Sequence, residues 1–146
     1  MPTVYLAAIG DSKTYGSDCC VAAGGYRDPL TSRLIALEVN DWQFTAPVYA
    51  VGGVTTATVA GDIAAYLDTL DPAKVPLHVL INLGTNDLPG IQSGSITQTP
   101  WVNNMGTILD AVHAKWPSAK VYLMRVYWSA YTAAQDTLDD TYIPAV

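Results

Sequence analysis

The chain has 146 residues, of which half are hydrophobic, and its 14% of charged residues lies well below the roughly 25% of an ordinary soluble domain. This length fits one domain, and we take residues 1–146 as a single domain. So much apolar sequence excludes an intrinsically disordered chain. A formal net charge of −6 argues against binding to nucleic acid. No apolar run reaches the length of about 18 residues that predicts a membrane span.

The first half of the chain alternates short β-branched runs with stretches of helical periodicity. Residues 3–9 predict a buried strand, and residues 28–39 predict a helix. Residues 44–51 then predict a second strand, and residues 56–70 a second helix.

The second half continues this alternation. Residues 77–83 predict the central strand, and residues 89–100 predict a loop because they are rich in Gly, Ser, Thr and Pro. Apolar residues three or four apart predict an amphipathic helix over residues 101–116. Residues 120–128 predict a last strand, followed by a helix near residues 141–143.

Strands that alternate with helices favour parallel pairing through right-handed crossovers. The predicted fold class is therefore α/β, a flavodoxin-like three-layer α/β/α arrangement around a parallel sheet. In such folds the functional site forms at the carboxyl ends of the strands. Three clusters of glycine and polar residues follow predicted strands here, so they are the candidate site.

The first cluster is Gly10-Asp11-Ser12. Glycine allows a sharp turn, so a serine just beyond the strand can expose its hydroxyl. Such a serine suits a nucleophile whose proton is taken by a general base. The same residues also suit an ordinary Asp-Ser turn or a helix cap.

The second cluster, residues 51–56, contains paired glycines whose backbone N–H groups can face a ligand. Donors of this kind stabilise the negative oxygen of a tetrahedral intermediate. Alternatively, the segment is a plain turn in which Thr55 or Thr56 caps the next helix.

The third cluster, residues 84–87, contains Asn86, whose side-chain amide is a neutral donor suited to the same oxygen. Asn and Asp are also ordinary turn residues, so a simple turn is an equal alternative. Because the ends of parallel strands meet at one edge, we expect Ser12, a glycine and Asn86 to converge on one point.

The remaining polar candidates are predicted to lie outside this site. His78 falls within the central strand and is expected in a core or buried polar position, and His113 is expected on a helix surface. Asp136, Asp139 and Asp140 are interpreted as first-turn residues of the last helix.

The two cysteines, Cys19 and Cys20, are adjacent, a spacing that does not suit a mutual disulfide. We expect unpaired thiols. Two thiols without further ligands make a weak metal site, so the cysteine pair predicts no bound metal.

Together, Gly10-Asp11-Ser12, Gly53 and Gly84-Thr85-Asn86-Asp87 resemble the first three sequence blocks of the SGNH hydrolases, also called the GDSL esterase/lipase superfamily. Gly53 is matched rather than Gly52 because the family pattern places a threonine two residues on, here Thr55. Residues 24–27 with Leu30, and residues 141–146, resemble the branch that contains carbohydrate acetyl esterases.

The resemblance implies a serine esterase that acts on carboxylic esters, with O-acetyl groups on carbohydrates as the expected substrate. Ser12 would be the nucleophile, and the Ser12 N–H, the Gly53 N–H and the Asn86 side chain would form the oxyanion hole. No metal or organic cofactor is implied.

The sequence departs from the family in one respect, because it contains no Asp-x-x-His motif to supply the general base. We expect this motif beyond Val146, together with a last strand and helix, on a longer chain or on a second chain that carries the remainder. Under this expectation the sheet would leave the far edge of its last strand unpaired. The protein would be cytoplasmic, or secreted with its leader absent.

Two other functions compete with the esterase. One is a catalytically silent glycan-binding module on the same fold. The other is a flavodoxin-like nucleotide binder, which is disfavoured because the first loop is not a glycine-rich phosphate cradle.

Overall fold

The computed structural model describes residues 3–15, 27–37, 41–45, 49–126 and 129–145. Cys19 and Cys20, expected to be unpaired thiols, lie outside these ranges. So do residues 24–26 of the carbohydrate-esterase pattern.

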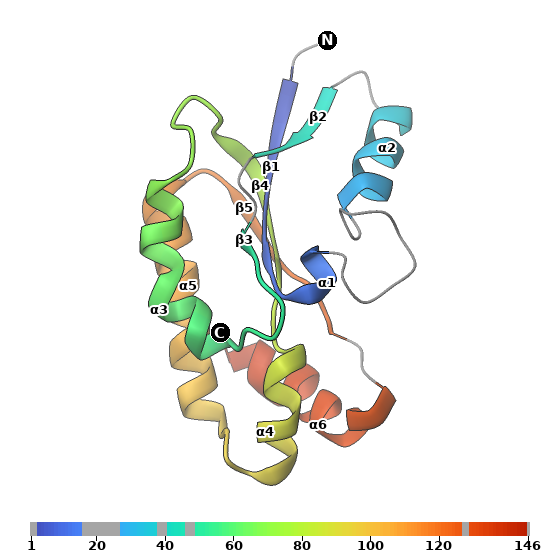
Figure 1. The fold of residues 1–146 in the computed structure, drawn as a ribbon, viewed down its shortest axis with the longest axis vertical. Helices are drawn as coiled ribbons and strands as arrows, with labels where there is room; N and C mark the ends of the chain where they lie inside the picture. The colour runs from blue at the N-terminus through green and yellow to red at the C-terminus, as the bar shows by residue number, and fades with distance from the viewer. Residues whose placement is uncertain (1–2, 16–26, 38–40, 46–48, 127–128, 146) are drawn as a thin grey trace.

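A parallel sheet forms the centre of the molecule (Figure 1). Its strands are β1 (Thr3–Gly10), β2 (Asp41–Phe44), β3 (Tyr49–Ala50), β4 (Pro76–Asn82) and β5 (Lys120–Leu123). The strand order is β2-β1-β4-β5, and β3 also pairs with β1. All pairings are parallel. The predicted α/β class is thereby confirmed.

Helices cover both faces of this sheet. In Figure 1, α3 (Thr56–Asp68) and α5 (Gln98–Lys115) lie side by side on one face, and α2 (Arg27–Leu37) lies across the other. The α3 and α5 side has a fully buried core, to which the sheet contributes Val79 and Ile81 and the helices contribute Val59, Ile63, Ile108 and Val112. The three-layer arrangement is as predicted.

Two predicted strands and one predicted loop differ from the structure. The strand expected over residues 44–51 is two strands, because Phe44 pairs with Leu6 and Tyr49 pairs with Ile9 farther along β1. The strand expected over residues 120–128 ends at Leu123; residues 127–128 lie outside the described ranges.

The third error is the loop expected over residues 89–100, part of which is the helix α4 (Leu88–Ser93). Pro89 stands in the first turn of α4, where a missing N–H leaves no hydrogen bond unmade. Gly94, at φ +76°, ends the helix. The same two residue types that suggested a loop therefore act as the start and the end of a short helix.

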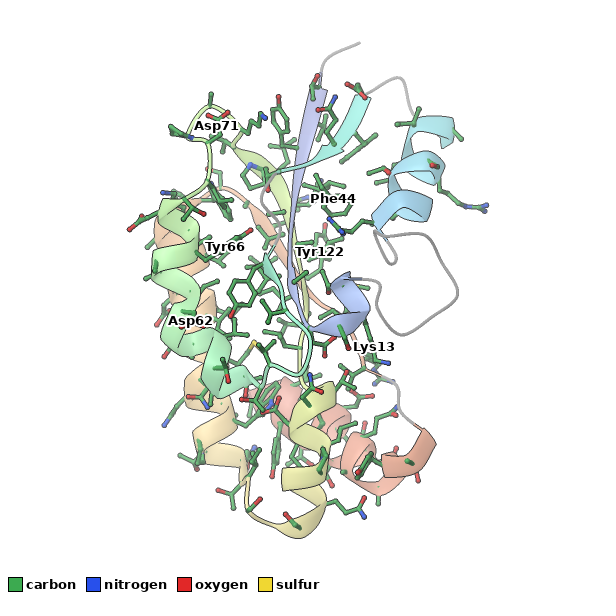
Figure 2. All side chains as sticks on the ribbon, in the orientation of Figure 1. Lys13, Phe44, Asp62, Tyr66, Asp71 and Tyr122 are labelled. Atoms are coloured by element: carbon green, nitrogen blue, oxygen red, sulfur yellow. The ribbon has the colours of Figure 1, made fainter. Side chains whose placement is uncertain are left out.

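The sheet face that carries α2 has an apolar groove of about 300 Å³. It is lined by Leu6, Leu30, Leu34, Trp42, His78, Leu80 and Tyr122. His78 is half-buried there, and its Nδ1 lies 3.2 Å from the Tyr122 hydroxyl. Tyr122, labelled in Figure 2, is 45% exposed. His78 is thus less buried than the sequence predicted, and its polar partner is the Tyr122 hydroxyl.

The chain after β5 is helical from Ser129 onwards, earlier than the helix predicted near residues 141–143. It comprises η2 (Ser129–Tyr131), α6 (Thr132–Thr137), a π-helical turn η3 (Leu138–Tyr142) and η4 (Ile143–Ala145). Tyr131, in η2, is partly buried and packs against the core.

Asp139 and Asp140 lie in the first turn of η3, as the sequence suggested, whereas Asp136 lies within α6 and not in its first turn. The sequence did not predict the burial of Asp139. This residue is buried within η3, with its Oδ2 3.9 Å from the Nε of Arg125. Burial raises the pKa of the Asp139 carboxyl above its ordinary value, although the Arg125 charge opposes this. The apolar neighbour Leu138 packs against Gly84.

Substitution by alanine should have opposite effects on stability at two of the glycines. Gly84 has φ +117°, and a Cβ there would lie 2.8 Å from Cδ2 of Leu138, so Gly84→Ala should lower the free energy of unfolding by about 1–3 kcal/mol. Gly61 is exposed within α3 with open space around it, so Gly61→Ala should raise that free energy by about 0.5–1 kcal/mol. Urea denaturation of both variants measures the difference. Equal effects of the two changes would contradict these expectations.

Asp139 should make stability depend on pH. Because its pKa is raised by folding, its contribution is greatest below the ordinary carboxyl pKa of about 4 and is lost as the pH rises through the raised folded-state value. Asp139→Asn cannot titrate, so its stability relative to the natural chain should improve as the pH rises from about 4 to 7. Urea denaturation across this range tests the prediction, and a constant difference at every pH would contradict it.

Candidate functional site

The carboxyl ends of three strands lie level with one another. Gly10, the last residue of β1, pairs with Ala50 of β3 on one side and with Asn82 of β4 on the other. The first cluster begins at Gly10 itself, the second follows Ala50 directly, and the third begins two residues after Asn82. The strand register therefore brings the clusters to one edge of the sheet, as the sequence predicted.

Ser12 begins a single helical turn, α1 (Ser12–Tyr15), directly after β1. A Cβ on Gly10 would overlap the side chain of Thr14 and lie 2.8 Å from the Asn82 carbonyl oxygen, so only glycine allows this tight reversal. Asp11 is fully buried, and its Oδ1 accepts a hydrogen bond from the Lys13 N–H at 2.9 Å. These contacts fix the backbone on both sides of Ser12, which is half-buried. The label of Lys13 in Figure 2 marks this turn.

The second cluster lies against this turn. The Val51 N–H donates to the Gly10 carbonyl at 3.2 Å, and a Cβ on Gly52 would lie 3.9 Å from the Ser12 Cβ. Gly53 is exposed and has φ +79°, a left-handed backbone that favours glycine. A side chain at position 52 would thus reach Ser12, whereas one at position 53 would meet open space. The choice of Gly53 as the oxyanion donor still depends on its spacing to Thr55.

The third cluster joins the second through Asn86. Gly84 turns the chain out of the strand, and Thr85–Asp87 form a short 3-10 helix, η1. The Asn86 Nδ2 donates to the Val54 carbonyl at 2.9 Å. A primary amide carries two N–H donors, so this bond orients the Asn86 side chain and leaves its second N–H for another acceptor.

Asp87 is a residue whose role sequence reasoning missed, because it was grouped with ordinary turn formers. It is 1% exposed and accepts from both the N–H and the hydroxyl of Thr56. Thr55, not Thr56, caps α3, since its hydroxyl accepts from the Thr58 N–H. The available signal was a carboxylate in the short turn that follows the buried strand β4.

Neither histidine of the sequence lies near Ser12. His78 is four residues before the end of β4, which places it about 13 Å back along the strand at roughly 3.3 Å per residue. His113 is exposed in the last turn of α5, as predicted. The chain enters β5 shortly afterwards, at the amino ends of the strands, whereas Ser12 lies at their carboxyl ends. The two histidines therefore do not serve Ser12 in this arrangement.

No group of three His, Cys, Asp or Glu residues that could hold a metal ion occurs within the parts of the chain that the structure describes. No helix in those same parts is both long and apolar enough to cross a membrane.

A parallel three-layer α/β fold with polar turns at the carboxyl ends of its strands is an arrangement in which α/β proteins commonly place their functional sites. The sequence matches the family described as GDSL-like Lipase/Acylhydrolase over residues 8–143. The chain therefore belongs to this family, which is a family of carboxylic ester hydrolases. A search of curated proteins finds no match.

Solved structures agree on the fold. A family 3 carbohydrate esterase from Clostridium thermocellum is similar with a TM-score of 0.65 and 20% identity, over 96% of this chain and 75% of the other. A family 3 carbohydrate esterase from Talaromyces cellulolyticus gives 0.70 and 17%, over 98% and 72%. AlinE4, an SGNH-hydrolase family esterase, gives 0.68 and 22%, over 98% and 74%. At these identities the likeness concerns the fold alone.

Proposed function

We propose that the chain is a serine esterase in which Ser12 attacks the ester carbonyl and Gly53 and Asn86 stabilise the oxyanion. One observation supports this most: the glycine turn lies against Ser12, while the Asn86 amide is bonded to Val54 of the same turn. A nucleophile is thus flanked by a backbone segment and a side-chain amide that can both donate hydrogen bonds. Family membership independently supports ester hydrolysis.

In this proposal the Ser12 Oγ forms a bond to the acyl carbon while a base removes its proton. The carbonyl oxygen becomes negative and accepts hydrogen bonds from the N–H groups of Ser12 and Gly53 and from the Asn86 amide. The intermediate then collapses, the alcohol leaves with the proton, and an acyl-serine remains. Water attacks this ester in the same way and releases the acid and free Ser12.

The base is proposed to be a histidine outside these 146 residues, held on an Asp-x-x-His segment. The positions of His78 and His113 support this, since neither reaches the carboxyl edge at Ser12. A serine hydroxyl is a weak nucleophile without an adjacent base. The segment could belong to the same polypeptide or to a second chain.

The proposed substrates are O-acetyl esters of carbohydrates. Two of the similar solved structures are named as family 3 carbohydrate esterases, and the sequence pattern near residues 24–27 resembles the acetyl-esterase branch. The chain is acidic, which suits neutral glycans better than anionic polymers.

The same lack of a nearby histidine favours a second candidate. A chain that positions Ser12 without a base could bind acetylated glycans and leave them intact. The two functions differ in one measurable step, the release of acetate.

Supplying a base from solution separates these two candidates. With imidazole present, the chain should hydrolyse p-nitrophenyl acetate about tenfold faster than the same imidazole solution does without the protein. That is only part of the roughly 10²–10⁴-fold that a positioned base contributes. Ser12→Ala should show no such increase, because the group that the base activates is gone.

The outcomes of this assay are distinct. An imidazole-dependent rate that Ser12→Ala retains in full would show that Ser12 is not the nucleophile. Calorimetric binding of an acetylated xylo-oligosaccharide, without acetate release even with imidazole, would favour the silent module.

Asn86→Ala tests the oxyanion donor. The Ser12-dependent kcat should fall roughly 10²–10³-fold, with KM little changed, because the lost hydrogen bond forms fully only in the transition state. Asn103→Ala, at an exposed position on α5, is the matched control and should leave kcat unchanged. A loss confined to KM would instead assign Asn86 to ground-state binding.

A further inference from the structure

The carboxylate of Asp87 is buried in an unusual setting. Asp87 and its partner Thr56 are each 1% exposed. The Thr56 N–H lies 3.3 Å from Oδ1 and 3.1 Å from Oδ2, and the Thr56 hydroxyl donates to Oδ1 at 2.9 Å. None of the ion pairs found among the described residues includes Asp87. Its negative charge is therefore balanced by neutral donors.

Burying such a carboxylate carries a cost. Burial raises the pKa of Asp87, as does the neighbouring charge of Asp11, while the bonds from Thr56 lower it. An unpaired buried charge is expensive unless good hydrogen bonds compensate it. A neutral side chain could fill the same space at a lower free-energy cost. We therefore ask what a carboxylate can do here that an apolar residue cannot.

The two partners of this bond lie next to the proposed oxyanion donors. Asp87 directly follows Asn86, and Thr56 begins the helix that follows the Gly53 turn. A second hydrogen bond runs beside this contact, from the Asn86 Nδ2 to the Val54 carbonyl. Two consecutive residues of η1 thus hold two positions, Val54 and Thr56, on either side of Thr55. The arrangement clamps the glycine turn to the asparagine turn.

We propose that Asp87 is a positioning residue, which acts through Thr56 to hold the Gly53 turn so that the Gly53 N–H and the Asn86 amide face Ser12 together. This inference rests on the proposed esterase function. Asp87 suits the role because each of its oxygens accepts without donating, so it can take both Thr56 donors at once. An asparagine in its place would turn an N–H₂ group toward one of these donors.

Paired substitutions at the two ends of this contact test the proposal. Thr56→Val keeps the carboxylate and removes the hydroxyl donor, Thr56→Ser restores that donor, and Asp87→Asn removes the charge. Thr69→Val is the control, because it removes a hydroxyl hydrogen bond to Tyr66 at the exposed far end of the same helix.

Ser12-dependent hydrolysis of p-nitrophenyl acetate with imidazole is the first measurement. Thr56→Val and Asp87→Asn should lower kcat about ten- to a hundredfold, less than the loss from a deleted oxyanion donor, with KM little changed. Thr56→Ser should retain kcat within about threefold, and Thr69→Val should match the natural chain. A natural kcat in Thr56→Val, while Asn86→Ala is impaired, would overturn the proposal.

Amide NMR of the ¹⁵N-labelled chain is the second measurement and does not need activity. The Gly53 N–H and the Asn86 side-chain signals should shift in Thr56→Val and return in Thr56→Ser, while Thr69→Val leaves them in place. Unmoved signals in Thr56→Val would overturn the positioning role. If no variant shows Ser12-dependent hydrolysis but these signals move as expected, the esterase proposal fails and the clamp stands. Where Asp87→Asn does not fold, Thr56→Val and Thr56→Ser decide the matter.

Discussion

The whole arrangement depends on the two-sided pairing of β1. Its last residue, Gly10, is level with Ala50 on one side and Asn82 on the other. A slip of one residue in either register would turn the buried side chains of β1 to the opposite face of the sheet. It would also separate the serine turn from the glycine and asparagine turns. Core packing and the geometry of the candidate site are therefore specified by the same backbone hydrogen bonds.

Beyond the carboxyl ends of the strands, hydrogen bonds outside the sheet connect the three turns. The Val51 N–H is bonded to the Gly10 carbonyl, and Asn86 and Asp87 bond to the turn and to the start of α3. Such bonds gain strength away from water, and a member without its partner is costly there. The geometry of this edge is accordingly well defined but sensitive to substitution, because the glycine turn is bonded to both of the other turns.

The sequence predicted those elements whose residues fall wholly within one pattern. The central strand, the helix beginning at Thr56 and the long amphipathic helix show clear periods, and the structure contains each of them. The sequence pattern was insufficient where tertiary contacts decide the secondary structure or the burial of a residue. Pro89 and Gly94 suit a loop and a helix equally, and Asp139 is polar by type but buried by the packing of η3. Asp87 was missed for a related reason, since its partner Thr56 is distant in sequence.

The sequence distance between paired strands also governs how the molecule forms. β1 pairs most extensively with β4, and the partners Leu6 and His78 lie roughly seventy residues apart, a separation that slows folding because a long loop must close first. During synthesis, Ser12 leaves the ribosome long before the strand that supplies the Asn82 carbonyl to its turn. The serine turn therefore cannot acquire its final geometry while the chain is still short. Ser12, the proposed nucleophile, therefore stays unorganised on the nascent protein until β4 has been synthesised and has paired with β1.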